Sequence, residues 1–228
     1  VWKTYKLYIG GAFPRTESGR YYRIESADGE LLANVCQGSR KDFRNAVVSA
    51  RKAFAGWAAR AAFNRSQIIY RIAEILEDRR LQFISELTMQ GATAESAALE
   101  LRESVDRLVY YAGWADKYQQ LFSSVNPVSS SHFNFSLLEP TGVVAVMAPE
   151  TNPLLGLISS VIPAIVGGNT VVVLASEGSP LSAITLSEVL NASDVPGGVV
   201  NVLTGSRTEL ASHMASHMDV NALVYCGG

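Results

Sequence analysis

The second half of the chain alternates short apolar runs with helix-length stretches, and this alternation restricts the fold more than any other feature of the sequence. The apolar runs cover 143–148, 170–174, 199–203 and 222–226, and the stretches between them cover 153–167, 180–192 and 207–217. Strands that are hydrophobic along their whole length are typical of parallel strands buried on both faces. The pattern therefore predicts an α/β fold with a Rossmann-like parallel sheet and helices on both faces.

The first half of the chain predicts two further layers. Residues 5–37 contain repeated glycine turns between short alternating runs, which favours short antiparallel strands. From Ser39 the periodicity becomes helical, and Asp42 three residues later is typical of a capping box. We expect helices over about 39–59, 62–79, a short segment ending near Gly91, and 94–122.

A polar stretch rich in serine separates the two halves and leads into a strand near 133–139. The prediction is a single domain over 1–228. Its parts are short strands and turns (1–38), a helical layer (39–122), a link with one strand (123–140) and the Rossmann-like half (141–228).

Composition excludes several classes of protein. A hydrophobic share of 48% with 18% charged residues is enough for a core, and a formal charge of −2 disfavours a nucleic-acid partner. The apolar stretch 154–168 is interrupted by Pro163 and is too short to cross a bilayer, so no membrane partner is expected. Cys36 and Cys226 form no disulfide framework, and we expect a reducing, cytoplasmic location.

The polar residues between the strand at 143–148 and the following helix are the first candidate site. Glu150, Thr151 and Asn152 stand between Pro149 and Pro153. The carboxyl end of a parallel strand is where α/β proteins hold their ligands. Two interpretations remain open for Asn152, which either contributes to a site or caps the helix that begins at Pro153.

Several longer motifs then suggest a family. In chain order they are WKTYKLYIGG, AVVSARKAFAGWA, YYAGWADK, EPTGVVAVMAP, NPLL, PAIVGGNTVVV, SEGSPL, PGGVVNVLTG and SHMDVNALVY. Their order and spacing resemble the N-terminal half of the aldehyde dehydrogenase superfamily. The resemblance implies NAD(P)-dependent oxidation of aldehydes by a cysteine in a later domain. It also implies dimers or tetramers joined through a strand pair, part of which the strand near 133–139 resembles.

The residues at the family's functional positions differ from its usual motifs. Where family members have Pro-Trp-Asn-Phe-Pro, Thr151 takes the place of the asparagine that helps hold the oxyanion, and Asn152 stands one position later. Losing one such donor costs about 10²–10³ in turnover. In the ribose-binding run, Leu174 replaces the lysine while Ser176 and Glu177 remain. Glu177 either accepts ribose hydroxyl protons or is a surface carboxylate.

Two further motifs differ in the same way. At the family's Thr-Gly-x-Gly turn, Gly205 remains but Arg207 replaces the second glycine. Arg207 either fills the cofactor's space or pairs with the extra phosphate of NADP. At the family's Phe-Thr-Gly-Ser, Gly228 lacks the serine hydroxyl that contacts the pyrophosphate, and Cys226 is expected to be a buried, inert thiol. His213 and His217 lie four residues apart, but no third ligand is evident, so no metal site is expected.

Two functions follow from this resemblance. The first is a non-catalytic module without a cofactor, most similar to the degenerate second module of the two-module family-sixteen aldehyde dehydrogenases. Its partner would be a second copy, a paired aldehyde dehydrogenase module or another protein. Because the chain begins with Val1 rather than Met, we expect it to be part of a longer protein. The alternative is the NAD(P)-binding half of an active aldehyde dehydrogenase.

Overall fold

A computed structural model describes residues 4–26 and 28–226 of the chain. Its centre is a four-stranded parallel sheet with strand order β8-β7-β6-β9. The strands are β6 (Val143–Met147), β7 (Thr170–Leu174), β8 (Val200–Leu203) and β9 (Ala222–Tyr225). Every residue of β6, β7 and β8 is buried, as expected for parallel strands covered on both faces. The predicted Rossmann-like sheet is confirmed.

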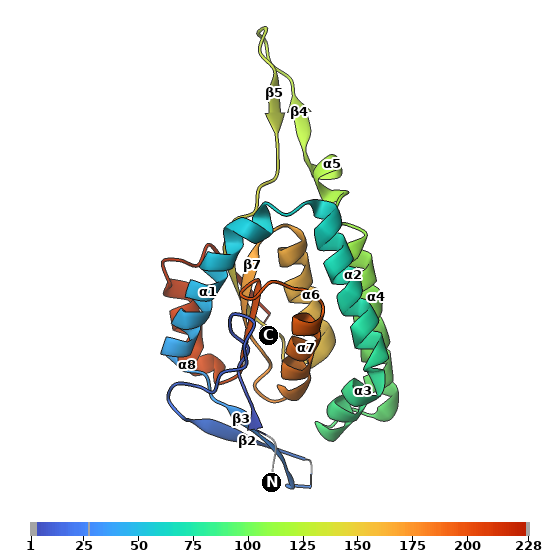
Figure 1. Cartoon of the computed structure of the whole chain (residues 1–228), viewed down its shortest axis with the longest axis vertical. Coiled ribbons are helices and arrows are strands. Elements are labelled where there is room, and N and C mark those ends of the chain that lie inside the picture. Colours follow the sequence, from blue (N-terminus) through green and yellow to red (C-terminus); the bar gives the residue numbers. More distant parts are fainter. Residues whose placement is uncertain (1–3, 27, 227–228) are drawn as a thin grey trace.

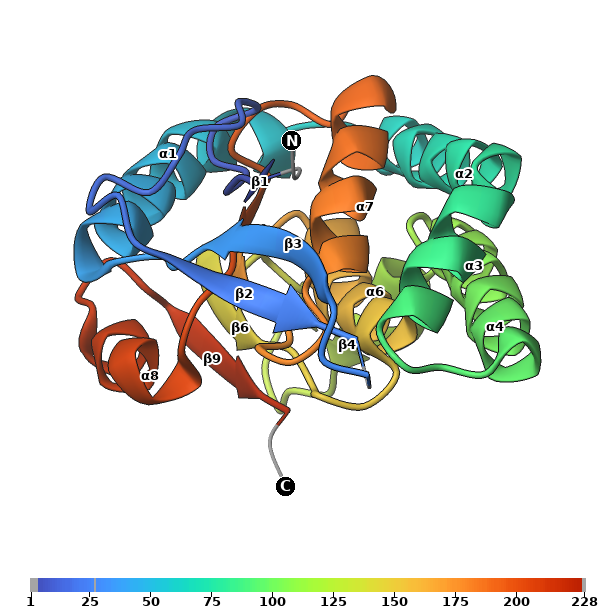
Figure 2. The same cartoon turned by 90° about the horizontal axis from the view of Figure 1, so that it is seen from below.

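Helices cover both faces of this sheet (Figures 1 and 2). On one face lie α1 (Arg40–Ala58) and α8 (Arg207–Ser216), whose buried residues share one apolar cluster with β6 and β7. On the other lie α6 (Pro153–Val166) and α7 (Leu181–Ala192). An outer layer of α2 (Ala62–Asp78), α3 (Arg80–Met89) and α4 (Ala94–Ala112) packs against α6 and α7. The helical layer predicted over 39–122 is therefore divided: α2, α3 and α4 form the outer layer, whereas α1 packs directly on the sheet.

Two helix predictions have different outcomes. The capping box at the start of α1 is present, since the Ser39 side chain accepts from the Asp42 N–H and the Asp42 carboxylate accepts from the Ser39 N–H. The long helix predicted over 94–122 is wrong, because α4 ends at Ala112 and a turn precedes α5 (Tyr118–Phe122). Gly113 occupies the C-cap and donates its N–H to the Val109 carbonyl. Glycine is a poor helix former, so the helix ends there even though the apolar periodicity of the sequence continues beyond it.

The short N-terminal strands form a separate sheet with order β1-β3-β2. β2 (Tyr21–Glu25) and β3 (Leu31–Cys36) are antiparallel as predicted, but β1 (Thr4–Tyr5) is parallel to β3, which the turn pattern did not predict. After β1 the chain makes a tight antiparallel turn at Gly10 and Gly11, where Ile9 and Ala12 exchange backbone hydrogen bonds, as expected for a glycine turn. Just before this turn it reaches the main sheet, where the Tyr8 N–H bonds the Val202 carbonyl of β8 at 2.9 Å.

The segment predicted as a link and one strand is a projecting two-stranded hairpin (Figure 1). β4 (Ser124–Asn126) pairs antiparallel with β5 (Asn134–Ser136). β4 therefore lies in the part expected to be an irregular link, and β5 is shorter than the predicted 133–139. Phe133 and Phe135 are 74% and 54% exposed. We call residues 124–138 the arm.

A glycine in α6 sets how closely this helix approaches the loop after β6. A Cβ at Gly156 would lie 2.2 Å from Pro149 Cγ, so the helix or the loop would have to move. We expect Gly156→Ala to lower the free energy of unfolding by about 1–3 kcal/mol, measured by denaturant titration. The matched control is Gly56→Ala in α1, where a Cβ meets nothing within 4 Å. That change should raise stability by about 0.5–1 kcal/mol. A neutral Gly156→Ala would contradict the close contact.

Candidate functional site

The loops after β6, β7 and β8 meet at the carboxyl edge of the sheet, and Glu150 joins them. Its carboxylate accepts hydrogen bonds from Ser176 Oγ at 2.6 Å and from the backbone N–H groups of Glu177 and Gly178, each at 3.3 Å. It also pairs with Arg207 Nη2 at 3.0 Å. Each loop can be recognised separately in the sequence, but this contact between them cannot. We use the name cleft for this meeting point of the three loops at the carboxyl edge of the sheet.

Arg207 is the first residue of α8, and its side chain extends across the cleft. Its guanidinium donates from Nη2 to the Ala148 carbonyl as well as to Glu150, and its Cζ lies 5.8 Å from the centre of the Tyr225 ring. Its side chain is 21% exposed. The cation therefore points back over the end of β6 and not outward into solvent.

Glu177 has a role inside the fold. Its carboxylate accepts the backbone N–H of Arg207 at 3.0 Å and so caps the first turn of α8. A helix N-terminus favours negative charge, and it is the usual position of a dinucleotide pyrophosphate in Rossmann-like folds. At α8 a side chain of the protein itself occupies that position.

Leu174 and Gly205 also serve the packing of the domain. Leu174 is 1% exposed and lies in the apolar cluster between the sheet and α1 and α8. Gly205 has φ +145°, and a Cβ there would lie 3.0 Å from the Gly38 backbone nitrogen. The neighbouring Thr204 carbonyl accepts the Gly38 N–H at 2.7 Å. Close packing of this loop on the segment before α1 is therefore sufficient to require glycine.

Thr151 and Asn152 are exposed at the start of α6. Asn152 is at the N-cap position in a left-handed conformation, with φ 49° and ψ 63°, and its side chain makes no capping bond in the described structure. The alternative that its side chain caps α6 is therefore wrong. A side-chain cap requires an extended N-cap residue, and the left-handed backbone of Asn152 differs from this.

Glu100 of α4 caps α6 instead. Its carboxylate accepts the N–H groups of Leu154 at 2.8 Å and Leu155 at 3.1 Å. The side chain is buried, and burial raises the pKa of the Glu100 carboxyl while the two N–H donors oppose this. Glu100 was not predicted as a functional residue, although it shares the buried helix face of Ala97 and Leu101. A glutamate on an otherwise apolar face was the available signal.

Tyr22 of β2 borders the cleft and was also missed. Burial raises the pKa of its phenol well above the usual range, and the carboxylates of Glu177 and Glu150 add to the effect. Its buried hydroxyl has no hydrogen-bond partner among residues 4–26 and 28–226. Because β2 lies far from the cleft loops in sequence, no local pattern connects them.

The remaining predicted positions have mixed outcomes. Cys226 is partly exposed and not buried as predicted, because it follows the edge strand β9, and both cysteines are free thiols. Gly228 lies outside the described residues.

Within the described ranges, no group of three or more His, Cys, Asp or Glu side chains could hold a metal ion. In the same part of the chain, no helix combines the length and the apolar character needed to cross a membrane.

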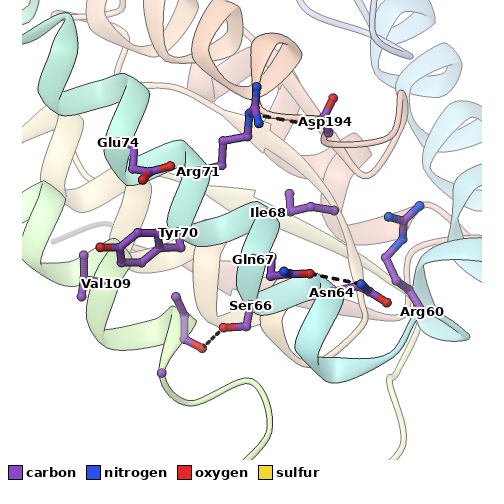
Figure 3. A pocket seen from close by; sticks show the side chains of 12 residues that line it. Arg60, Asn64, Ser66, Gln67, Ile68, Tyr70, Arg71, Glu74, Val109 and Asp194 are labelled. Carbon is purple, nitrogen blue, oxygen red and sulfur yellow. Dashed lines mark hydrogen bonds and ion pairs between the residues drawn. The ribbon is translucent and has the colours of Figure 1, made fainter.

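A separate hollow of about 720 Å³ lies on the outer layer, between α2 and α4 (Figure 3). Arg71 points toward Asp194 along its rim, with Nε 3.7 Å from the carboxylate, and Asn64 bonds Gln67 at 3.2 Å. None of the cleft residues Glu150, Glu177 and Arg207 lines it. The hollow is therefore distinct from the carboxyl edge of the sheet.

The buried parallel sheet, the helices on both faces and the polar loops at the carboxyl ends define the Rossmann-like class of α/β proteins. Comparison with known proteins gives the family. The profile of the aldehyde dehydrogenase family matches residues 13–228. The chain belongs to this family.

Individual relatives agree with that assignment. Over 227 residues the chain is 34% identical to the mitochondrial benzaldehyde dehydrogenase of Antirrhinum majus, covering 97% of this chain and 42% of that protein. The NAD⁺ complex of an aldehyde dehydrogenase from Bacillus cereus matches with TM-score 0.93 and 27% identity, over 98% of this chain and 46% of that one. A Pseudomonas syringae aldehyde dehydrogenase C variant with NAD⁺ and octanal gives 0.89 and 30%, over 96% and 44%. The chain spans less than half the length of each of these relatives.

The Glu150 contacts predict a measurable pH dependence of stability. Burial raises the pKa of Glu150, but the hydrogen bonds from Ser176, Glu177 and Gly178 and the charge of Arg207 outweigh it, so the pKa is lowered. A carboxylate of this kind stabilises the fold above its unfolded-state pKa of about 4.3. This contribution is lost as the pH falls through the folded-state value.

We expect Glu150→Gln to lower the free energy of unfolding at pH 7 by about 1 kcal/mol, because the carboxylate is partly exposed. The variant should also lose less stability than the parent chain between about pH 5 and pH 3. Denaturant titrations across this range measure both effects. The control is Glu30→Gln, at an exposed carboxylate that makes no hydrogen bond or ion pair in the described structure. Identical pH profiles for the two variants would contradict the role of Glu150.

Proposed function

We propose that this domain is a non-catalytic aldehyde dehydrogenase module whose nucleotide cleft is occupied by its own side chains, and that it serves assembly with another module or copy. The Glu150–Arg207 pair is the observation that supports this most directly. It spans the loops after β6 and β8, where a dinucleotide would lie. No catalytic residue and no cofactor is assigned to the described chain in this proposal.

Electrostatics favours the same proposal. A bound pyrophosphate would bring negative charge next to the carboxylates of Glu150 and Glu177, and like charges at short range repel. It would also have to displace Glu177 from the α8 N-terminus and Arg207 from the Ala148 carbonyl. Leu174 offers no donor to a ribose hydroxyl, and its buried position leaves it no access to the cleft. The residues present therefore do not fit NAD(P).

The alternative is the NAD(P)-binding half of an active aldehyde dehydrogenase, and two observations favour it. Ser176, Glu177 and Gly205 remain at positions that match the family's motifs. The relatives include the NAD⁺ complexes from Bacillus cereus and Pseudomonas syringae. In this alternative Arg207 turns outward and pairs with a cofactor phosphate.

The companion module and the compartment are further parts of the proposal. A degenerate second module, as in the two-module family-sixteen proteins, would pair with a complete dehydrogenase module. The two free cysteines fit a reducing compartment such as the cytoplasm. The Antirrhinum majus relative is named as mitochondrial, so localisation of the full-length protein by microscopy is the direct test.

A nucleotide titration separates the two functions. With 1 mM NAD⁺, NADH or NADP⁺, we expect the free energy of unfolding to change by less than about 0.4 kcal/mol, as for a ligand at or below its Kd. The double variant Glu150→Ala, Arg207→Gly should bind NAD⁺ at least tenfold more tightly than the parent chain by calorimetry, since the blocking side chain and the carboxylate that pairs with it are both gone. Arg207→Lys, which keeps charge and reach, is the matched control. A gain above about 1.4 kcal/mol for the parent chain would instead support the active alternative.

Association through the arm is the second part of the proposal to be tested. Phe133 and Phe135 expose apolar rings on neighbouring positions of the arm, 5.5 Å apart between centroids. We expect Phe133→Ser and Phe135→Ser each to raise the protein concentration needed for association about tenfold. Light scattering would then show a larger share of monomer at a given concentration. Phe63→Ser, at a 65% exposed ring on α2, is the control. An interface with a micromolar Kd would be largely formed at about 100 µM protein. A parent chain that is monomeric at this concentration would therefore contradict self-association.

A further inference from the structure

A hollow of about 470 Å³ lies between the first turns of α1 and the end of α8. The two helices run side by side on one face of the sheet in both views (Figures 1 and 2). Four basic side chains line it: Arg40 and Arg44 from α1, His213 and His217 from α8 and its C-cap. Each pair is spaced by four residues, so each pair shares one face of its helix. We call this the α1–α8 pocket.

The two arginines have no acidic partner in the described chain. No carboxylate among residues 4–26 and 28–226 lies within 4.0 Å of the guanidinium of Arg40 or Arg44. Cations nearby are paired, since Lys41 Nζ lies 3.0 Å from Glu17 and Arg20 Nη2 lies 2.8 Å from Glu209. Two uncompensated guanidinium groups therefore remain on one rim of the pocket.

The opposite rim presents an oriented imidazole. His217 Nδ1 accepts the Asp219 backbone N–H at 3.2 Å, so the ring proton is on Nε2. The ring also packs edge-on against Phe43, with centroids 5.6 Å apart. These contacts fix both the orientation of the ring and its donor atom. His213 lies one turn earlier on the same side of α8.

We propose that the α1–α8 pocket binds the phosphate group of a small phosphorylated molecule. Planar guanidinium groups bind phosphate oxygens with two parallel N–H bonds, and imidazole N–H groups donate to the same oxygens. The two arginines repel a metal ion, and the pocket has only Asp219 as a carboxylate ligand. The negative charge of the Asp219 carboxylate repels an anion, but the two positive charges of Arg40 and Arg44 exceed it. The histidine pair that the sequence analysis left without a function thus gains one.

The pocket is separate from the cleft and does not depend on the proposed function. Arg207 begins α8 and faces the carboxyl edge of the sheet, whereas His213 and His217 lie toward the other end of this helix. Ten residues of α-helix span about 15 Å. The pocket volume falls in the range of about 300–1,000 Å³ that is typical of small-molecule sites. A single phosphate ion would leave much of it empty, so we expect the phosphate to bear an organic group.

The chain contains three histidines, which makes NMR of their ring signals a direct test. Inorganic phosphate and glycerol 3-phosphate are titrated into the whole chain at fixed pH and constant ionic strength. We expect the signals of His213 and His217 to shift with saturation at millimolar ligand, with glycerol 3-phosphate binding at least as tightly as phosphate. The internal reference is His132, which lies in the arm. Shifts of His132 equal to those of the pair, or no saturation, would overturn the proposal.

Variants of the rim complete the test. Arg40→Ala and Arg44→Ala should each weaken binding at least threefold, and Asp219→Asn should strengthen it by a similar factor. Arg102→Ala, at an exposed arginine of α4 without an ion pair in the described structure, should leave binding unchanged. Circular dichroism confirms that each variant is folded. If Arg102→Ala weakens binding as much as the rim variants, the binding is nonspecific and the proposal fails. If inorganic phosphate binds and glycerol 3-phosphate does not, the ligand is the free ion and the proposal of a phosphorylated molecule is overturned.

Discussion

The burial of β6, β7 and β8 on both faces is the constraint on which the rest of this structure depends. Parallel strands cannot be joined by tight turns, so each connection must cross over through a helix. The helices divide between the two faces of the sheet, and every loop that follows a strand emerges at the same edge. Three such loops bring together Glu150, Glu177 and Arg207, which are distant in sequence. The cleft is therefore a consequence of the way the core is covered.

The sheet and its helices could be predicted because their signals are local. Apolar runs and glycine or serine boundaries placed most helices and strands within one or two residues of their observed ends. The errors occurred where a non-local contact or a single residue decided the outcome. Gly113 ended a helix whose apolar pattern continues, and β1 pairs parallel to β3, which lies far along the chain from it.

The candidate site was predictable in position and not in its interactions. Strand ends located Thr151, Glu177 and Arg207, but their partners could be known only from the fold. Glu150 was identified from the sequence only as one of the polar residues after a strand, and in the structure it is the acceptor that joins three loops. Glu100 was missed because its capping of α6 connects two helices far apart in sequence. A motif comparison detects which residues have changed, but it does not show what the replacements contact.

The two edges of the main sheet differ, and the difference has a consequence for the chain in solution. The β8 edge is met by Tyr8, whose backbone pairs with Val202, whereas β9 has a neighbour on one side only in the described structure. Leu223, Val224 and Tyr225 of β9 are also exposed. An open strand edge with apolar side chains is a template for pairing with another strand. Two copies that paired along β9 would form one continuous sheet, joined by hydrogen bonds between their backbones.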